Sequence, residues 1–359
     1  MTRGPVRHRQ KPVRSEGVGY GKLLLFGEHA AVFGHPAVGM SLPLRTRVVV
    51  SSVTPSEAET KAVRDEAERG LSPPDDLVEI RDLYAEARRL MGGRPEEEYD
   101  RSFVVDSSVP IGVGFGSSAA LCVAIVRATE EGFLRTPAGG RRSEAEIWRV
   151  AHELEKRYHG TPSGIDTGLG ALGGARLFRR SEHPAGRHAD GLPTVEPLRS
   201  PAAFLVVAAL TRESSTKELV AGVRRRLEVE PARISPALER LGRIAEEAAA
   251  QLSSSEAHSS VTTKRMEDAV ALGDLCEEAQ ILLRTIGVSS GRVEDALEVL
   301  RAAGATGAKL SGAGGGGAVF GLFDTAEAAA RGKSRLSNLG ETRIWVMESH
   351  DDGTILTIG

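Results

Sequence analysis

The sequence has few of the residues on which several protein classes depend. Of its 359 residues, only two are cysteine, and aromatic residues make up 4%. Two cysteines are too few for a disulfide framework or a thiolate metal site, which favours a reducing, cytoplasmic setting. So low an aromatic content argues against stacking surfaces for single-stranded nucleic acid.

Charge and hydropathy exclude further classes. The formal net charge is −3, with both signs interspersed, so there is no basic footprint for duplex nucleic acid. The longest apolar run, residues 202–210, has the length of a strand and falls far short of the roughly 20 residues that span a bilayer. We therefore expect a protein that binds neither nucleic acid nor membrane. Residues 1–16 are expected to form a disordered basic tail.

The remaining sequence predicts a mixture of helices and strands. Apolar stretches at 23–26 and 44–53 are typical of strands. The clearest helix is predicted at 143–159, where Ser143 and Glu146 form a capping box ahead of an apolar stripe. Residues 158–174 are interpreted as a long turn-rich stretch. Further helices are expected near 216–229, 232–253, 261–284, 291–303 and 325–338.

Glu155 falls on the apolar stripe of the helix predicted at 143–159. A carboxylate on a buried face costs several kcal/mol unless a positive group meets it. Two interpretations are open at this stage. The residue lies at the edge of the helix and reaches water, or a cation lies beside it.

The segment "GVGFGSSAA" at 112–120 combines bare backbone with two hydroxyls at the start of an apolar run. Glycines let backbone N–H groups approach an anion, and the N-terminus of a helix favours negative charge. A phosphate site is one interpretation, and a structural turn is the other. No lysine follows the glycines as in a Walker A loop, and the G-x-G-x-G spacing is not a dinucleotide fingerprint.

Two other segments carry polar residues beside short apolar strands. In "SGAGGGG" at 311–317, the glycines lie between apolar strand ends, which favours close backbone approach over a flexible linker. In "GKLLLFGEH" at 21–29, Lys22 precedes a strand, and Glu28 and His29 follow it. Each of these charged residues alone is usually just surface, so only their combination carries weight.

Together the segments "GKLLLFGEHAAVFG", "PIGVGFGSSAA" and "KLSGAGGGG" resemble the three motifs of the GHMP kinase superfamily, in the same order. The resemblance covers about residues 17–350. Within the superfamily, "FGEHAAVFGHPAVG", "EKRYHGTPSGIDT" and "STKELVAGVRRRL" are most similar to mevalonate kinases. The sequence departs from the usual pattern at Tyr20, Phe115 and Thr161, none of which removes a group that the chemistry needs.

The resemblance implies a two-domain α+β fold. The N-terminal domain, expected at 17–195, would resemble ribosomal protein S5 domain 2. The C-terminal domain, expected at 196–359, would be ferredoxin-like, with the site between the two domains. The resemblance also implies ATP and Mg²⁺ as cofactors, mevalonate as the small-molecule substrate, a role in isoprenoid precursor synthesis and a possible homodimer.

Residue by residue, the resemblance implies the following roles. Asp166 and Lys22 would be catalytic, and Ser118 and Glu155 would hold Mg²⁺. Residues expected to bind ATP are Ser107, Gly112, Val113, Gly114, Phe115, Gly116, Ser117 and Ser118. Residues expected to bind substrate are Lys22, Glu28, His29, Asp166, Thr216 and the backbone near Ala313. The second glycine loop, 311–317, is expected to back the first and line the substrate site.

Two alternatives stay open from the sequence. One is another small-molecule kinase of the superfamily, acting on phosphomevalonate or a sugar. A phosphorylated substrate would require extra cationic side chains, for which Arg212, Lys217 and the arginines at 224–226 are candidates. The other is a ligand-sensing protein without catalysis, although Lys22 and Asp166 are both present.

Overall fold

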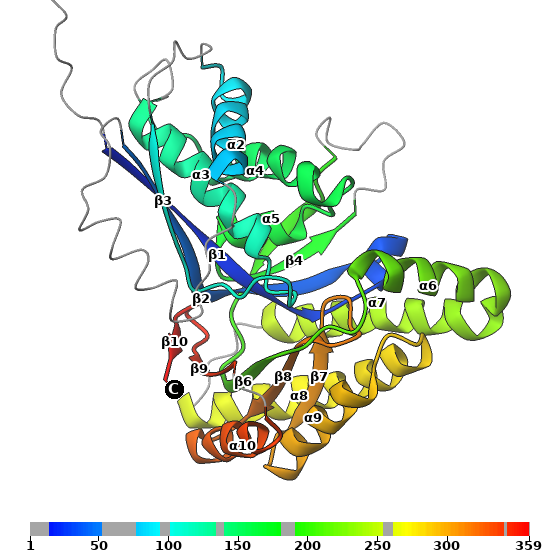
Figure 1. Cartoon of the computed structure of the whole chain (residues 1–359). Coiled ribbons are helices and arrows are strands. Elements are labelled where there is room, and N and C mark those ends of the chain that lie inside the picture. Colours follow the sequence, from blue (N-terminus) through cyan, green and yellow to red (C-terminus); the bar gives the residue numbers. More distant parts are fainter. Residues whose placement is uncertain are drawn as a thin grey trace, which may run out of the picture.

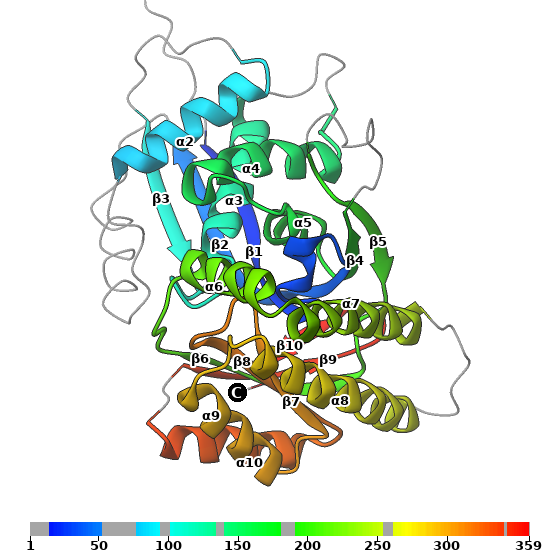
Figure 2. The ribbon, with the colours of Figure 1, turned by 90° about the vertical axis from the view of Figure 1, so that its right-hand side faces the viewer.

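The computed structural model describes residues 14–51, 77–93, 101–133, 140–180, 191–253, 261–340 and 343–358. These residues form two five-stranded sheets, one in each half of the chain. The two halves stack one above the other in Figure 2. The two-domain α+β expectation is confirmed. Among the described residues, no helix has both the length and the apolar character that crossing a bilayer requires.

The first sheet contains β1 (Arg14–Phe26), β2 (Ala37–Ser51), β3 (Ser102–Ser107), β4 (Ala175–Arg179) and β5 (Thr194–Leu198). The long strand β2 pairs antiparallel with β1 along one edge, and with β3 and then β4 along the other. Helices α2 (Leu77–Leu90), α3 (Ser117–Phe133), α4 (Glu144–His159) and α5 (Ile165–Leu172) gather on one face of this sheet (Figure 1). The short helix η1 (Ala30–Phe33) connects β1 to β2.

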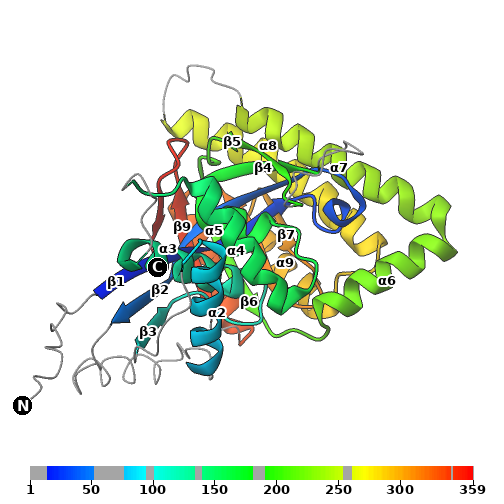
Figure 3. The ribbon, with the colours of Figure 1, turned by 90° about the horizontal axis from the view of Figure 1, so that it is seen from above.

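Helix α3 lies unusually close to β1 because the strand carries glycine where they touch. A Cβ atom added at Gly17 or Gly19 would lie 2.0 Å from a backbone carbonyl oxygen of α3, that of Ala124 or Ala120. Glycine at these two positions therefore permits the close contact between α3 and the first half of β1. Seen from above, α3, α4 and α5 lie over β1 and β2 (Figure 3).

The second sheet has the order β10-β9-β6-β8-β7. Its strands are β6 (Ala203–Leu210), β7 (Gly307–Ser311), β8 (Gly317–Phe323), β9 (Ile344–Ser349) and β10 (Ile355–Thr357). Its helices are α6 (Thr216–Val229), α7 (Pro231–Ser253), α8 (Val261–Thr285), α9 (Gly291–Ala302) and α10 (Ala326–Asn338). The helices expected in this half are confirmed, with bounds that differ by at most one residue.

The larger of two hydrophobic cores is shared between the halves. It joins residues of β1 such as Leu23 and Phe26 to residues of β6 such as Val207. The smaller core lies beneath α2, α3, α4 and α5. Because burying apolar area is the main favourable term in folding, the shared core ties the two halves together.

Two local predictions have different outcomes. The helix expected at 143–159 is confirmed as α4, with Ser143 as N-cap and its capping box with Glu146 formed. The interpretation of 158–174 as a long turn-rich stretch missed a helix, because α5 forms within it. That helix is buried against bulky neighbours, since a Cβ atom at Gly168 would lie 2.9 Å from Phe178 and 3.0 Å from Trp148. Tertiary packing outweighs the poor helix propensity of its glycines.

The chain passes from the first sheet to the second between Leu198 and Ala203. Of the predicted basic tail, residues 1–13 lie outside the described residues. The last three residues of that tail, 14–16, belong to β1 and pair with β2. Glu16 also pairs with Arg47, which faces it from β2.

Candidate active site

The first glycine loop connects the end of β3 to the start of α3. Gly112, Gly114 and Gly116 all have positive φ, at 78°, 91° and 74°. L side chains rarely adopt this region, so glycine is required for the path that the backbone takes. The loop delivers the chain to Ser117 and Ser118, the first two residues of α3. The unpaired N–H groups of that helix end are suited to an anion.

The residues predicted to bind ATP differ in whether their side chains are free to contact a ligand. The side chains of Val113 and Phe115 are buried, and the Phe115 ring packs against Trp345 with centroids 5.4 Å apart. The Ser107 hydroxyl hydrogen-bonds to the Thr46 hydroxyl at 2.8 Å across the β2–β3 pair. In this loop the groups left to contact a ligand are therefore mainly backbone amides and the two serines of α3.

Lys22 and Asp166 meet beneath the first glycine loop. Lys22 Nζ lies 3.2 Å from Asp166 Oδ1, and the side chains are 6% and 35% exposed. The Lys22 amide donates to the Phe115 carbonyl at 2.9 Å. A Cβ atom at Gly116 would lie 3.0 Å from the Lys22 side chain and 3.9 Å from that of Asp166. The loop thus covers an ion pair in which the carboxylate of Asp166 remains partly exposed to solvent.

Glu155 is buried on α4 with one carboxylate oxygen, Oε2, lacking a hydrogen-bond partner. Burial, and then the nearby carboxylate of Asp166, raise its pKa to about 8, while Lys22 acts in the opposite direction. Burial, and then the carboxylate of Glu155, raise the pKa of Cys122, which lies one turn after Ser118 on α3. Of the two interpretations left open by the sequence, the one in which Glu155 reaches water at the helix edge is wrong, because the residue is buried. The cation beside it stays a prediction.

His29 hydrogen-bonds to the second glycine loop. Its Nε2 lies 2.9 Å from the carbonyl oxygen of Ala313. A carbonyl can only accept, so Nε2 carries the proton. Burial lowers the pKa of His29, which keeps the ring neutral and leaves Nδ1 as an acceptor. Nδ1 is buried and has no partner, and His29 has the positive φ of 59° that non-glycine residues seldom adopt.

Glu28 forms an ion pair with Lys309 of β7, and both side chains are fully buried. The Lys309 ammonium also donates to the Leu310 carbonyl and lies over the ring of Phe320. Next to it, the Ser311 hydroxyl donates to the Leu24 carbonyl at 2.8 Å and accepts from the Leu24 amide at 3.0 Å. The structure therefore places Glu28 between the two halves of the molecule, where it pairs with Lys309 and not with an open site.

Arg212 lies next to the first glycine loop and contacts Thr216. Arg212 Nη1 donates to the Thr216 hydroxyl at 3.1 Å. Its Nη2 lies 3.3 Å from the position of a Cβ atom at Gly114, and the carboxylate of Asp166 is close enough to affect its pKa. Arg212 Nε is buried without a partner. A guanidinium with unused donors therefore lies beside the loop and Asp166.

The second glycine loop packs against backbone. Cβ atoms at Gly314 and Gly316 would lie 2.1 Å from the Val288 carbonyl and 2.2 Å from the Thr211 carbonyl. A Cβ at Gly317 would lie 3.1 Å from the Val113 carbonyl of the first loop. The second loop thus lies behind the first, and its glycines permit this close approach.

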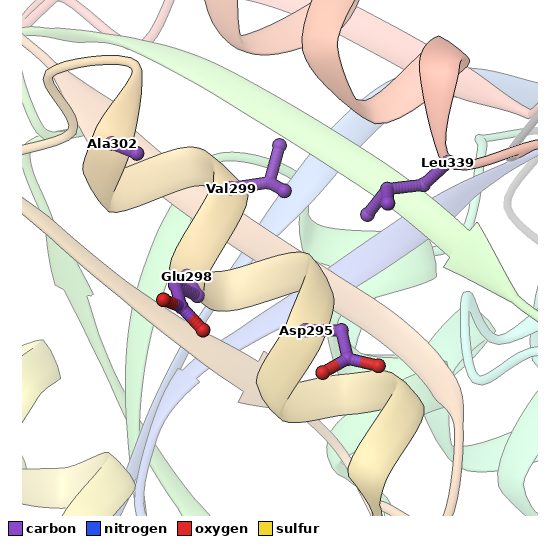
Figure 4. A pocket seen from close by; sticks show the side chains of 5 residues that line it. All are labelled: Asp295, Glu298, Val299, Ala302 and Leu339. Carbon is purple, nitrogen blue, oxygen red and sulfur yellow. The ribbon is translucent and has the colours of Figure 1, made fainter.

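The pocket in Figure 4 lies elsewhere. Its lining residues come from α9 and from the end of α10: Asp295, Glu298, Val299, Ala302 and Leu339. None of them is a residue that the sequence motifs predict for the site.

Sequence reasoning missed some residues that contact the predicted site residues. Lys309 carried a signal, because a lysine between apolar residues of a strand requires a partner, but the sequence does not say which carboxylate provides it. His159 was not singled out, yet its Nε2 lies 3.2 Å from the Ser118 hydroxyl. Arg212 was noted only as a possible marker of a phosphorylated substrate.

Comparisons with known proteins identify the family to which a chain with this site belongs. The GHMP kinases N terminal domain matches residues 81–174, and the GHMP kinases C terminal domain matches residues 257–342. The chain belongs to the GHMP kinase family.

Individual relatives are similar over most of their length. The mevalonate kinase of Pyrococcus abyssi is 33% identical over 313 residues, covering 84% of this chain and 86% of that protein. The mevalonate kinase of Thermococcus sibiricus is 32% identical with the same coverage. In fold, the chain is similar to the crystal structure of L. major mevalonate kinase in complex with R-mevalonate. That match has a TM-score of 0.70 at 24% identity and covers 97% of each chain.

Proposed function

We propose that the protein transfers the terminal phosphoryl group of ATP to the primary hydroxyl of mevalonate, giving 5-phosphomevalonate and ADP. The observation that carries this proposal is the Lys22–Asp166 pair directly beneath Gly116 of the first glycine loop. A phosphate held by that loop and an alcohol beside Asp166 would be neighbours. The similarity to mevalonate kinases supports the choice of acceptor.

Asp166 and Lys22 would act on the attacking hydroxyl. An aspartate has an ordinary pKa of about 3.9, whereas an alcohol is about as weak an acid as water, whose pKa is about 15.7. Complete deprotonation of the alcohol by Asp166 before phosphoryl transfer would therefore cost roughly 16 kcal/mol. The proton therefore moves late, as the loose transition state makes the hydroxyl acidic. Asp166 accepts it, and Lys22 stabilises the charge that develops on the oxygen. Arg212 is placed to stabilise charge on the transferred group.

The residues present fit a Mg²⁺ ion that accompanies the nucleotide. Mg²⁺ binds through one or two protein oxygens together with phosphate oxygens and water. Glu155 provides a buried carboxylate oxygen without a partner, and Ser118 provides a hydroxyl at the start of α3. We propose these two as its protein ligands. When bound, the ion neutralises phosphate charge, and it would also lower the pKa of Glu155.

His29 and Thr216 are the proposed contacts to the rest of the acceptor. The unpartnered Nδ1 of His29 can accept a hydrogen bond from a hydroxyl. The Thr216 hydroxyl accepts from Arg212, which leaves its own proton free to donate to a carboxylate. Mevalonate carries both of these groups besides its reacting hydroxyl. Glu28 is proposed to act indirectly, because its side chain is fully buried and its Oε1 pairs with Lys309.

The proposal is tested with a coupled assay for ADP release. Wild-type protein and Asp166→Asn are each given MgATP with mevalonate, phosphomevalonate, galactose or homoserine. We expect turnover with mevalonate alone and its loss in the variant. Turnover with a different acceptor would overturn the proposed substrate, and no turnover by a folded protein that binds ATP would favour a sensing role.

A further inference from the structure

Among the residues that the structure describes, the hydroxyl of Ser118 has one partner, and no motif assigns a role to that residue. His159 Nε2 lies 3.2 Å from Ser118 Oγ, at a distance that permits a hydrogen bond. His159 is the last residue of α4, and Ser118 is the second residue of α3. The contact therefore joins the end of one helix to the beginning of the other.

Helix α4 carries two groups toward this end of α3. Glu155 and His159 are four residues apart, which puts them one above the other on the same face of the helix. Glu155 lies close enough to raise the pKa of Cys122, one turn along α3 from Ser118. One face of α4 thus presents a carboxylate and an imidazole to the segment that starts with Ser118.

A serine hydroxyl has one proton to donate and two lone pairs that accept. If the proton points to His159 Nε2, both lone pairs are left for a cation. If His159 donated instead, one lone pair would be used and the hydroxyl proton would be free to point at the cation. The first arrangement suits a metal ligand, and it requires a neutral His159 with its proton on Nδ1.

We propose that His159 is a positioning residue, which accepts the proton of Ser118 and so aims the serine oxygen at the Mg²⁺ of the bound nucleotide. This inference rests on the proposed nucleotide and metal site. It does not depend on which alcohol is phosphorylated. The alternative is that His159 only provides positive charge at the C-terminus of α4, as basic residues often do.

The test measures nucleotide binding without turnover. Isothermal titration with a non-hydrolysable ATP analogue is carried out on the full chain, with excess Mg²⁺ and again with EDTA. We expect His159→Leu to weaken binding about three- to tenfold with Mg²⁺, which is the range for one hydrogen bond. In EDTA the change should be less than twofold. His159→Gln, which keeps an acceptor, should recover most of the lost affinity.

A double-mutant cycle and a matched control identify the partner. In a Ser118→Ala background, His159→Leu should have no further effect, because the hydroxyl that it positions is gone. Lys156→Gln removes a positive charge from the same helix end without contacting Ser118, and it should bind like the wild type. His159 is exposed, so its variants should keep the thermal midpoint of the wild type.

Each contrary result overturns the proposal. If His159→Leu weakened nucleotide binding equally with Mg²⁺ and with EDTA, His159 would act on the phosphates or on the stability of α4. If Lys156→Gln weakened binding as well, His159 would act through the positive charge at the end of α4. A loss that persists without the Ser118 hydroxyl would remove the proposed partner. Wild-type binding that Mg²⁺ does not strengthen, or His159→Leu binding like the wild type, would also overturn it. Failure of the acceptor assay alone would leave this result standing and would remove only the proposed substrate.

Discussion

Two lysine–carboxylate pairs lie within the same part of the molecule and differ in their surroundings. Lys22 and Asp166 meet at 3.2 Å, and the carboxylate is 35% exposed. Lys309 and Glu28 are both 0% exposed and link β7 to the turn after β1. Of these four side chains, only the carboxylate of Asp166 is substantially exposed to water. The same chemical groups are therefore partly open to a ligand in one place, where we propose catalysis, and are buried between the two halves of the fold in the other.

The comparison also shows what burial does to the energetics of an ion pair. A buried pair loses solvation, and its members depend on each other, so removing one leaves an uncompensated charge. A partly exposed pair can exchange its partner for water or for a ligand at smaller cost. Activity should therefore be sensitive to the first pair, and stability to the second.

The largest expected effect is on catalysis. Asp166→Asn keeps the size of the side chain and removes the proton acceptor, so we expect kcat to fall about 10²- to 10⁴-fold. Unfolding in urea should change less than in the buried Lys309 variant described below, because the Asp166 carboxylate is 35% exposed and water can take its place beside Lys22. Steady-state assays and urea titrations of the same preparation make the comparison. A variant with wild-type kcat would remove Asp166 from the mechanism.

The second expected effect is on stability. Lys309→Met leaves Glu28 buried without its partner, so the free energy of unfolding should fall by about 3–5 kcal/mol. Adding Glu28→Gln to this variant should restore part of that loss, since the unpaired charge is removed with it. Urea titration of the wild type, both single variants and the double variant completes the cycle. Strictly additive losses would show that the two residues do not depend on each other.

Glu155 provides a pH-dependent test, because it is a buried carboxylate whose Oε2 lacks a hydrogen-bond partner. Its folded-state pKa, about 8, lies above its ordinary value of 4.5. The folded state therefore binds the proton more tightly, and the stability that this provides is complete below about pH 4.5. It is lost as pH rises through about 8, a change on the order of a few kcal/mol.

The corresponding measurement follows the thermal midpoint of the protein in EDTA from pH 5 to pH 9. Glu155→Gln cannot titrate, so its midpoint should depend less on pH across this range. Identical pH profiles for the two proteins would show that Glu155 is not the group responsible.

The smallest expected effect comes from a pair on the surface of α4. Lys156 Nζ lies 2.6 Å from Glu153 Oε1, and both side chains are largely in water. Lys156→Gln should lower the free energy of unfolding by less than about 0.5 kcal/mol and leave kcat unchanged. A larger loss in urea titration would mean that exposure does not separate the strong pairs of this chain from the weak ones.

Several parts of this protein follow from short-range sequence patterns. The capping box and apolar stripe of α4 involve residues a few positions apart, and the helix forms where they predict it. The glycine loop ahead of Ser117 is also local, because glycine is what its positive φ values require. The family motifs identified Lys22 and Asp166 as partners, and the structure brings them together.

The tertiary structure decided which distant groups meet. Glu28 and Lys309 are 281 positions apart, His29 and Ala313 are 284 apart, and Ser118 and His159 are 41 apart. Nothing in the local sequence selects these partners, because they depend on how the two sheets and their helices pack. Helix α5 shows the same limit, since its glycine-rich segment becomes helical only where Trp148 and Phe178 cover it. Local sequence determined the conformations available to the backbone, and long-range packing determined the electrostatic surroundings of each charged side chain.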